Sequence, residues 1–157
     1  GGQQSGMRSG TDNVPGAAGM AEAARIMYEH LEENREHMYQ MKERLAEGLS
    51  RLERVQIHGM PLREGAPQIL SAAFAGIRSE VLLHSLEEQG IYVSAGSACS
   101  SHKRTASSTL TAIGLKKDVS ETTVRFSFSE ETTAEEIDYC LEVLGKLLPV
   151  LRRYTRR

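Results

Sequence analysis

The sequence predicts an α+β (α/β) fold, in which a long N-terminal helix precedes a small, mostly antiparallel sheet with helices on one face. Three observations predict it. Apolar residues recur at steps of three and four over residues 15–52. Short apolar runs bounded by Gly and Pro follow, and residues 123–129 alternate strictly between apolar and polar side chains. The C-terminal stretch returns to the helical period.

The N-terminal segment divides at Pro15. Residues 1–14 are polar and Gly-rich and are expected to form a loop, and Pro15 suits the first turn of a helix. A helix over residues 15–52 would be a rod of ~57 Å at ~1.5 Å per residue. So long a helix cannot bury its whole length in a small body, so it should link to another domain or pack on a partner. Its apolar stripe consists of Met20, Ala24, Met27, Leu31, Met38, Met41, Leu45, Leu49 and Leu52.

Residues 53–157 are expected to form the small C-terminal α+β domain. Strands are predicted at "RVQIHG" (54–59), "PQILSAAF" (67–74), "IYVSA" (91–95) and "TVRFSFS" (123–129). A helix should begin at Ser79, place Val81, Leu82 and Leu86 inward, and stop at Gly90.

Two further helices complete the predicted domain. A short one is capped by Ser107 or Ser108 and ends at Gly114. The last begins at a capping box of Thr133 and Glu136. Its apolar stripe consists of Ile137, Cys140, Leu141, Leu144, Leu148 and Leu151.

Composition excludes several classes of function. The chain has 157 residues, a net charge of -2 and an aromatic content of 5%, so nothing favours nucleic acid or an anionic membrane as partner. No apolar run approaches the ~20 residues that span a bilayer, and the polar N-terminus is no signal peptide. Two cysteines form no disulfide framework and no zinc spacing, and no His is assigned to a metal. A cytoplasmic protein is expected.

The two cysteines differ in their surroundings. Cys140 lies on an apolar helical stripe and is expected to be a buried small hydrophobe. Cys99 lies among small residues in "SAGSACSSHKR", just before His102, Lys103 and Arg104. Nearby cations lower a thiol pKa and favour the reactive thiolate. The local sequence is equally consistent with a merely exposed thiol.

Two other stretches have a functional and an ordinary interpretation. Arg125 is in mid-strand on the face opposite the apolar one, so it is either a solvated Arg, the favoured interpretation on local sequence, or a guanidinium fork for a carboxylate. The stretch from Arg8 to Thr11 follows three glycines and is either a phosphate-binding nest or simply a loop.

Together these stretches resemble a known family. "GGQQSGMRSGT" before a long helix, then "GAPQILSAAF", "SAGSACSS" and "TTVRFSFSEETTAEEID", occur in the order found in pyridoxal-phosphate-dependent cysteine desulfurases of the class V aminotransferase group. The Ser-Gly-Ser-Ala-Cys element resembles the iron–sulfur-cluster-assembly subgroup. The resemblance covers essentially the whole chain and implies the C-terminal domain of a fold-type I enzyme.

The resemblance implies a role for three residues. Cys99 matches the nucleophile that takes sulfur from L-cysteine and holds it as a persulfide, leaving L-alanine. Arg125 matches the arginine that binds the substrate carboxylate. Thr11 matches the threonine that reaches the cofactor phosphate of the neighbouring subunit. The implied parent is a homodimer that contains pyridoxal phosphate and delivers sulfur to an acceptor such as an iron–sulfur scaffold.

The cofactor lysine is not matched. In the family, the Schiff-base lysine lies upstream of the segment that this chain resembles. "SSHK" (100–103) mimics its motif, but it sits inside the cysteine loop and lacks the expected Gly-Pro-Lys-Gly run. The chain alone is therefore expected to bind no pyridoxal phosphate and to be inactive as a desulfurase. Two alternatives stay open: a non-catalytic docking module for a sulfur acceptor, and a cofactor-free persulfide relay.

Overall fold

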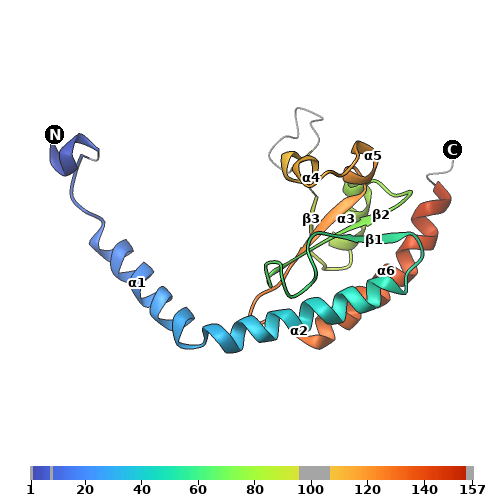
Figure 1. The fold of residues 1–157 in the computed structure, drawn as a ribbon, viewed down its shortest axis with the longest axis horizontal. Helices are drawn as coiled ribbons and strands as arrows, with labels where there is room; N and C mark the ends of the chain where they lie inside the picture. Colours follow the sequence, from blue (N-terminus) through green and yellow to red (C-terminus); the bar gives the residue numbers. More distant parts are fainter. Residues whose placement is uncertain (1, 8, 96–106, 155–157) are drawn as a thin grey trace. The chain divides into compact units, whose positions relative to one another are not determined.

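The computed structural model describes residues 2–7, 9–95 and 107–154 (Figure 1). The chain divides into two compact units, Gly1–Glu33 and Asn34–Arg157. The described elements, in chain order, are η1 (Gln3–Gly6), α1 (Val14–Glu29), α2 (Leu31–Ser50), β1 (Val55–His58), β2 (Ile69–Phe74), α3 (Ser79–Glu87), β3 (Ser94–Ala95), α4 (Ser108–Ala112), α5 (Lys117–Ser120), β4 (Thr123–Ser127) and α6 (Ala134–Tyr154).

The first unit is a 3-10 turn followed by the solvent-exposed helix α1. Asn13 caps α1, because its side-chain oxygen accepts a hydrogen bond from the Gly16 N–H at 3.1 Å. Pro15 lies in the first turn, as the sequence predicts. α1 buries none of its residues, and its large apolar side chains Met20, Ile26 and Met27 are exposed.

The helical stretch expected over residues 15–52 is interrupted. Two helices, α1 and α2, meet at His30, whose φ of -118° and ψ of 19° leave the helical region. Neither Pro nor Gly lies at this point, so the usual sequence signals of a helix break are absent. The apolar periodicity continues through the break, which is why periodicity alone predicts one helix.

The sheet of the second unit has four strands in the order β1-β2-β4-β3, and every pairing is antiparallel. The prediction of a small antiparallel sheet is confirmed. β4 therefore lies between β2 and β3, with Leu70 opposite Phe126 and Ala95 opposite Val124. This register places the central strand β4 next to the end of the short strand that leads toward Cys99.

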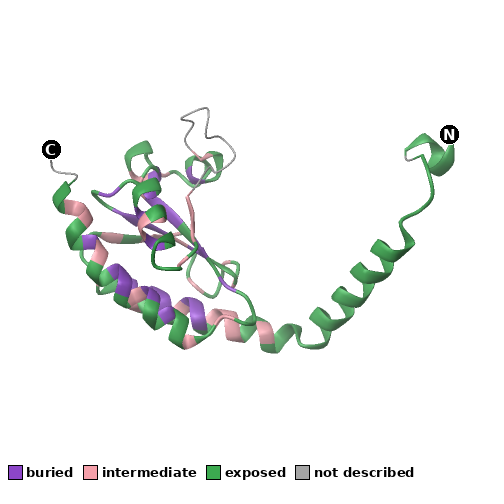
Figure 2. Cartoon of the chain, turned by 180° about the vertical axis from the view of Figure 1, so that it is seen from behind, coloured by how far each residue is buried: buried purple, intermediate pink, exposed green. Residues whose placement is uncertain are grey.

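One face of the sheet packs against helices and forms the core (Figure 2). Strand alternation sends Leu70, Phe74 and Val124 into this face. α2, α3 and α6 cover it with fully buried leucines, each of which stabilises the fold by roughly 1.5–3 kcal/mol. These leucines are Leu45, Leu49, Leu82, Leu86, Leu144 and Leu148.

Most helix ends follow their predicted signals. Ser107 caps α4 by accepting from the Leu110 N–H at 3.4 Å. The capping box of α6 is formed: Thr133 N–H donates to Glu136 Oε2 at 2.8 Å, and Glu136 N–H donates to Thr133 Oγ1 at 3.3 Å. Gly90 adopts a φ of +74° just beyond α3, which explains why a glycine stops this helix.

Three local predictions are wrong. The strand predicted over residues 91–95 contains only Ser94 and Ala95, because the Ile91 N–H is used by the end of α3, where it donates to Leu86 O at 3.0 Å. Val81 points outward with 46% of its surface exposed, and Arg78, not Ser79, is the N-cap of α3. Ser79 is instead buried, and its N–H donates to Glu121 O at 2.9 Å.

Candidate functional site

A row of polar side chains crosses the sheet on the face opposite the core. His58 pairs with Ser71, Ser71 with Arg125, and Arg125 with Ser94. The row therefore takes one residue from each of the four strands. Because facing residues of antiparallel strands share a side of the sheet, these four side chains project from one surface. The strand register thus assembles this polar row from positions that are far apart in the sequence.

Arg125 is the cationic member of this row. Its neighbours in β4 enter the core, so alternation holds its side chain on the other face, where it is exposed. Its Nη2 donates to Ser94 Oγ at 3.3 Å, which directs the guanidinium toward β3. This is the only hydrogen bond of the Arg125 side chain to another described residue, so most of its five donors stay available to a ligand.

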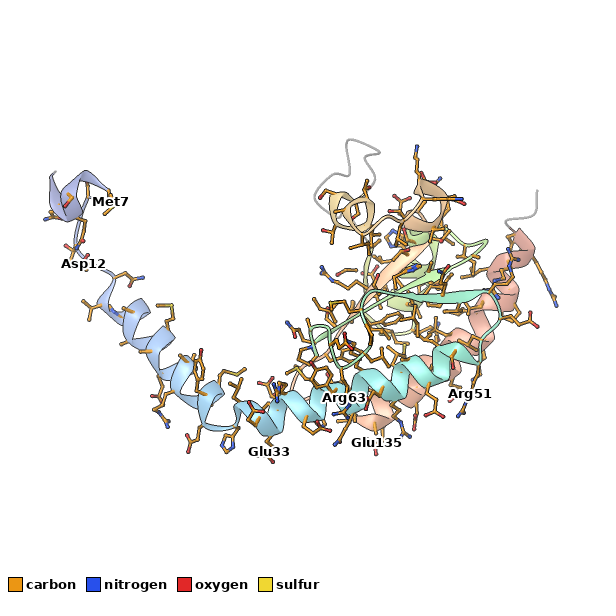
Figure 3. The ribbon with its side chains drawn as sticks, in the orientation of Figure 1. Met7, Asp12, Glu33, Arg51, Arg63 and Glu135 are labelled. Atoms are coloured by element: carbon orange, nitrogen blue, oxygen red, sulfur yellow. The ribbon has the colours of Figure 1, made fainter. Side chains whose placement is uncertain are left out.

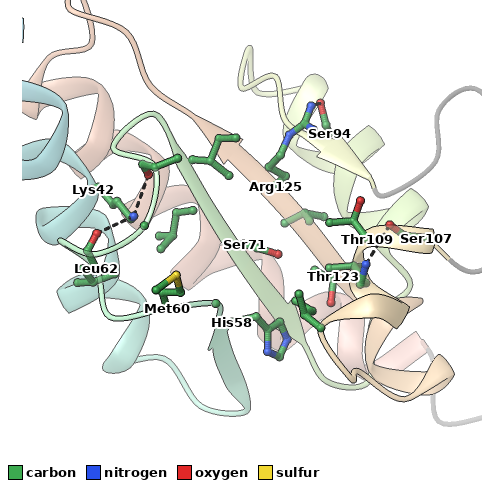
Figure 4. A pocket seen from close by; sticks show the side chains of 18 of the residues that line it. Lys42, His58, Met60, Leu62, Ser71, Ser94, Ser107, Thr109, Thr123 and Arg125 are labelled. Atoms are coloured by element: carbon green, nitrogen blue, oxygen red, sulfur yellow. Dashed lines mark hydrogen bonds between the residues drawn. The ribbon is translucent and has the colours of Figure 1, made fainter. Parts of the chain in front are cut away.

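The row forms one side of a pocket of about 660 Å³ (Figure 4). Its other walls come from the loop between β1 and β2 and from α4. Apolar side chains dominate these walls. Figure 4 shows Arg125 beside Ser94 at one end of the polar row. An apolar hollow with a few polar groups is typical of a small-molecule site. The apolar residues of these walls are Met60, Leu62, Leu110 and Ile113.

Lys42 of α2 fixes the loop wall of this pocket. Only 4% of its surface is exposed, and its Nζ donates to Leu62 O at 2.8 Å and to Ala66 O at 2.9 Å. Burial lowers the pKa of its ammonium group. The sequence analysis does not single out Lys42, although its position beside Met41 and three residues before Leu45 places it next to the apolar stripe.

A second set of contacts holds the same loop from outside. Arg63 donates from Nε to Glu43 Oε1 at 2.6 Å and from Nη1 to Glu36 Oε2 at 2.8 Å. These hydrogen bonds to Arg63 lower the pKa of both carboxyl groups. Arg63, labelled in Figure 3, also lies over the Tyr39 ring. Tyr39 donates its hydroxyl to Gly65 O at 2.9 Å. α2 therefore supports the pocket wall through both buried and exposed contacts.

His58 lies at the β1 end of the polar row. Its Nε2 atom is buried and has no hydrogen-bond partner among the described residues. Burial lowers the pKa of this imidazole, so the neutral form is favoured. The sequence analysis leaves His58 unassigned, since a single His in a short strand carries no functional signal without its register.

The structure places the predicted site residues differently. Arg125 lines the pocket. Thr11 is exposed in the first unit, between η1 and α1. Cys99 and the bases that follow it, His102 to Arg104, lie outside the described residues. Cys140 is buried on α6, as expected from its apolar stripe, and burial raises the pKa of its thiol to about 11.

Neither a metal site nor a membrane span emerges from the part of the chain that the structure describes. Within it, no three His, Cys, Asp or Glu side chains are grouped so that they could hold a metal ion. None of the helices in the described ranges is both long and apolar enough to cross a membrane.

Comparison with known proteins gives consistent matches. The family model "Aminotransferase class-V" matches residues 2–140. The NifS/IcsS protein homolog of Lactobacillus delbrueckii subsp. bulgaricus is 41% identical over 138 residues, covering 88% of this chain and 36% of that protein. The cysteine desulfurase IscS of Escherichia coli (strain K12 / DH10B) is 39% identical over 152 residues, covering 97% of this chain and 37% of that protein.

Solved structures match over nearly the whole chain. A NIFS-like protein superimposes with a TM-score of 0.81 at 36% identity, covering 96% of this chain and 38% of that one. The apo structure of a cysteine desulfurase from Thermococcus onnurineus NA1 gives a TM-score of 0.75 at 25% identity, with 94% and 34% covered. The chain thus spans little more than a third of the length of each of these relatives.

Proposed function

Because the chain belongs to the aminotransferase class-V family, we propose that it is the C-terminal portion of a cysteine desulfurase. Such an enzyme converts L-cysteine to L-alanine and holds the sulfur as a persulfide. The observation that carries the proposal is the pocket with Arg125 on its polar side and β3 at its edge. Only three residues, Gly96 to Ala98, separate the end of β3 from Cys99 in the sequence.

Arg125 and Cys99 would divide the work on the substrate. The Arg125 guanidinium binds the α-carboxylate through charge-assisted hydrogen bonds and so orients the amino acid. The Cys99 thiolate attacks the substrate sulfur; a sulfur–sulfur bond forms as the carbon–sulfur bond breaks. The bonding electron pair stays with carbon, which takes up a proton to give alanine. Cys99 then carries the transferred sulfur as a persulfide.

Pyridoxal phosphate is the cofactor that this reaction requires, and the described lysines do not fit its covalent attachment. The Nζ of Lys42, the one described lysine that lines the pocket, is engaged by two carbonyl oxygens. Lys116, Lys117 and Lys146 are exposed; Lys117 pairs with Glu121, and Lys146 pairs with Glu142. Lys103 lies outside the described residues, and its sequence lacks the Gly-Pro-Lys-Gly run expected after the attachment lysine, so we place that lysine elsewhere in the parent enzyme. The chain alone would bind no pyridoxal phosphate and would form no alanine.

The remaining parts of the chain would serve assembly. Residues 1–14 would belong to the cofactor domain, with Thr11 reaching the cofactor phosphate of the neighbouring subunit. Residues 15–52 would link that domain to the small domain, residues 53–157. The exposed apolar side chains of α1 support packing against other protein, as expected in a homodimer. The sulfur acceptor would be a protein such as an iron–sulfur scaffold, in the cytoplasm.

A chimera tests the proposal. The C-terminal segment of Escherichia coli IscS that aligns with this chain is replaced by the chain, and alanine formation from L-cysteine is measured with pyridoxal phosphate. We expect activity that Cys99→Ser abolishes and that Arg125→Gln lowers by about a hundredfold in kcat/KM. A folded chimera without alanine formation, or one that Cys99→Ser leaves active, would contradict the proposal.

Two control reactions address the alternatives. The isolated chain with pyridoxal phosphate and L-cysteine should yield no alanine. Persulfide loading of Cys99 in the isolated chain from thiosulfate, without cofactor, would instead identify a persulfide relay. Tight binding to a sulfur acceptor that is unaffected by Cys99→Ser, in an inactive chimera, would identify a docking module.

A further inference from the structure

The hydroxyl group of Ser94 is only partly used within the described structure. Its oxygen accepts the hydrogen bond from Arg125 Nη2 at 3.3 Å. Ser94 lines the same pocket as Arg125, and its hydroxyl donates a hydrogen bond to none of the described residues. A hydroxyl can accept one hydrogen bond while it donates another. The Ser94 proton is therefore available to a ligand beside the guanidinium.

We infer that Ser94 is a second carboxylate-binding residue, whose proton donates to the carboxylate that Arg125 binds and whose oxygen orients the guanidinium. This inference rests on the proposed role of Arg125. It makes the site a pair of donors from adjacent strands. One carboxylate oxygen accepts from the guanidinium, and the other accepts from the hydroxyl.

The sheet register supports this arrangement. Ser94 and Arg125 are directly paired across β3 and β4, so their Cβ atoms lie within roughly 4.5–5.5 Å. Serine has a single short side-chain torsion, so its oxygen is held close to the sheet. The long Arg125 side chain must bend toward β3 to reach it. Both donors are thus placed at one end of the pocket before any ligand binds, which reduces the entropy lost on binding.

Titration of the ¹⁵N-labelled chain with sodium propionate tests the inference by NMR at ionic strength held constant with sodium chloride. Propionate has the carbon skeleton of cysteine and alanine without the amino group, and neutral propionamide is the control ligand. We expect saturable shifts of the Arg125 Nε–H and of β3 and β4 amides with propionate, and none with propionamide. Ser94→Ala should weaken binding about ten- to a hundredfold, because a hydrogen bond to a charged group is lost.

Two further variants separate the hydroxyl effect from a structural one. Ser94→Thr keeps the hydroxyl and should bind propionate within about twofold of the wild-type affinity. Ser94→Ala should change the chemical shift of the Arg125 Nε–H, and Ser94→Thr should restore it. Ser127→Ala removes a serine hydroxyl from the same face of β4, outside the pocket, and should leave the propionate affinity unchanged. Dispersed amide spectra confirm that each variant is folded.

The outcomes distinguish this inference from the proposed function. If Arg125→Gln abolishes binding but Ser94→Ala binds like the wild type, the Ser94 role is refuted and the Arg125 role stands. If Arg125→Gln binds propionate normally, or the wild type shows no saturable shift, the Arg125 carboxylate site is refuted and the Ser94 role with it. Equal weakening by Ser94→Ala and Ser127→Ala, or failure of Ser94→Thr to rescue, also refutes the Ser94 role.

Discussion

Alkylation of Cys140 in the folded chain should be at least two orders of magnitude slower than alkylation of the same thiol in the unfolded chain. The test variant is Cys99→Ser, which leaves Cys140 as its only cysteine. Only 6% of the Cys140 surface is exposed, and burial raises the pKa of its thiol from 9.0 to about 11. Alkylation requires the thiolate, whose fraction falls tenfold for each unit of pKa when the pH is lower. At pH 8 the raised pKa alone therefore slows alkylation by about a hundredfold.

Restricted access of the reagent to the thiol slows alkylation further. The reagent must reach Sγ between α6 and the core, so reaction needs local opening of the helix. Iodoacetamide labelling followed by mass spectrometry compares the folded Cys99→Ser chain with the same chain in urea. A native rate within tenfold of the rate in urea would refute the reasoning. In the complementary variant, Cys140→Ala, we expect rapid labelling of Cys99.

Three further predictions concern stability. Lys42→Met should lower the free energy of unfolding by about 1–3 kcal/mol in urea titrations, because two carbonyl oxygens lose their donor; Lys146→Met, at an exposed helical ion pair, should cause no measurable change. Thr133→Ala should cost about 1 kcal/mol by the same measurement, because it removes the side-chain cap of α6. Because burial lowers the pKa of His58 below its unfolded value of about 6.5, its contribution to stability should be present above that pH and be lost as the pH falls below it. The decrease between pH 7.5 and pH 5.5 should be smaller in His58→Asn, and an equal decrease in both chains would contradict the assignment.

Periodicity predicts those parts of the fold in which burial alternates regularly. β4 is the clearest case, since Val124 and Phe126 are buried and Arg125 is exposed, as the alternation predicts. The stripe of α6 and its capping box are equally well predicted. In both elements apolar residues repeat at the geometric period of the backbone. The sequence pattern therefore predicts directly which side chains are buried.

The candidate site was only partly predictable because it depends on register and on contacts between distant residues. Arg125 is suggested by its position in a strand, but its pairing with Ser94 follows from the alignment of β3 with β4. Lys42 binds carbonyl groups 20 and 24 residues away, and no local signal marks a lysine for that role. The break at His30 has no Pro or Gly to announce it.

The strand order β1-β2-β4-β3 has a consequence for how the chain folds while it is being synthesised. When β3 leaves the ribosome, β4, its partner in the described sheet, has not yet been made, and one edge of β2 is unpaired. The apolar face of β2 also stays uncovered until α6, the last of the described elements, has been made. An unpaired edge beside an apolar face is a template for aggregation. Nascent chains that end before Thr123 should therefore depend on chaperones, whereas chains that extend through α6 can complete both the sheet and its cover.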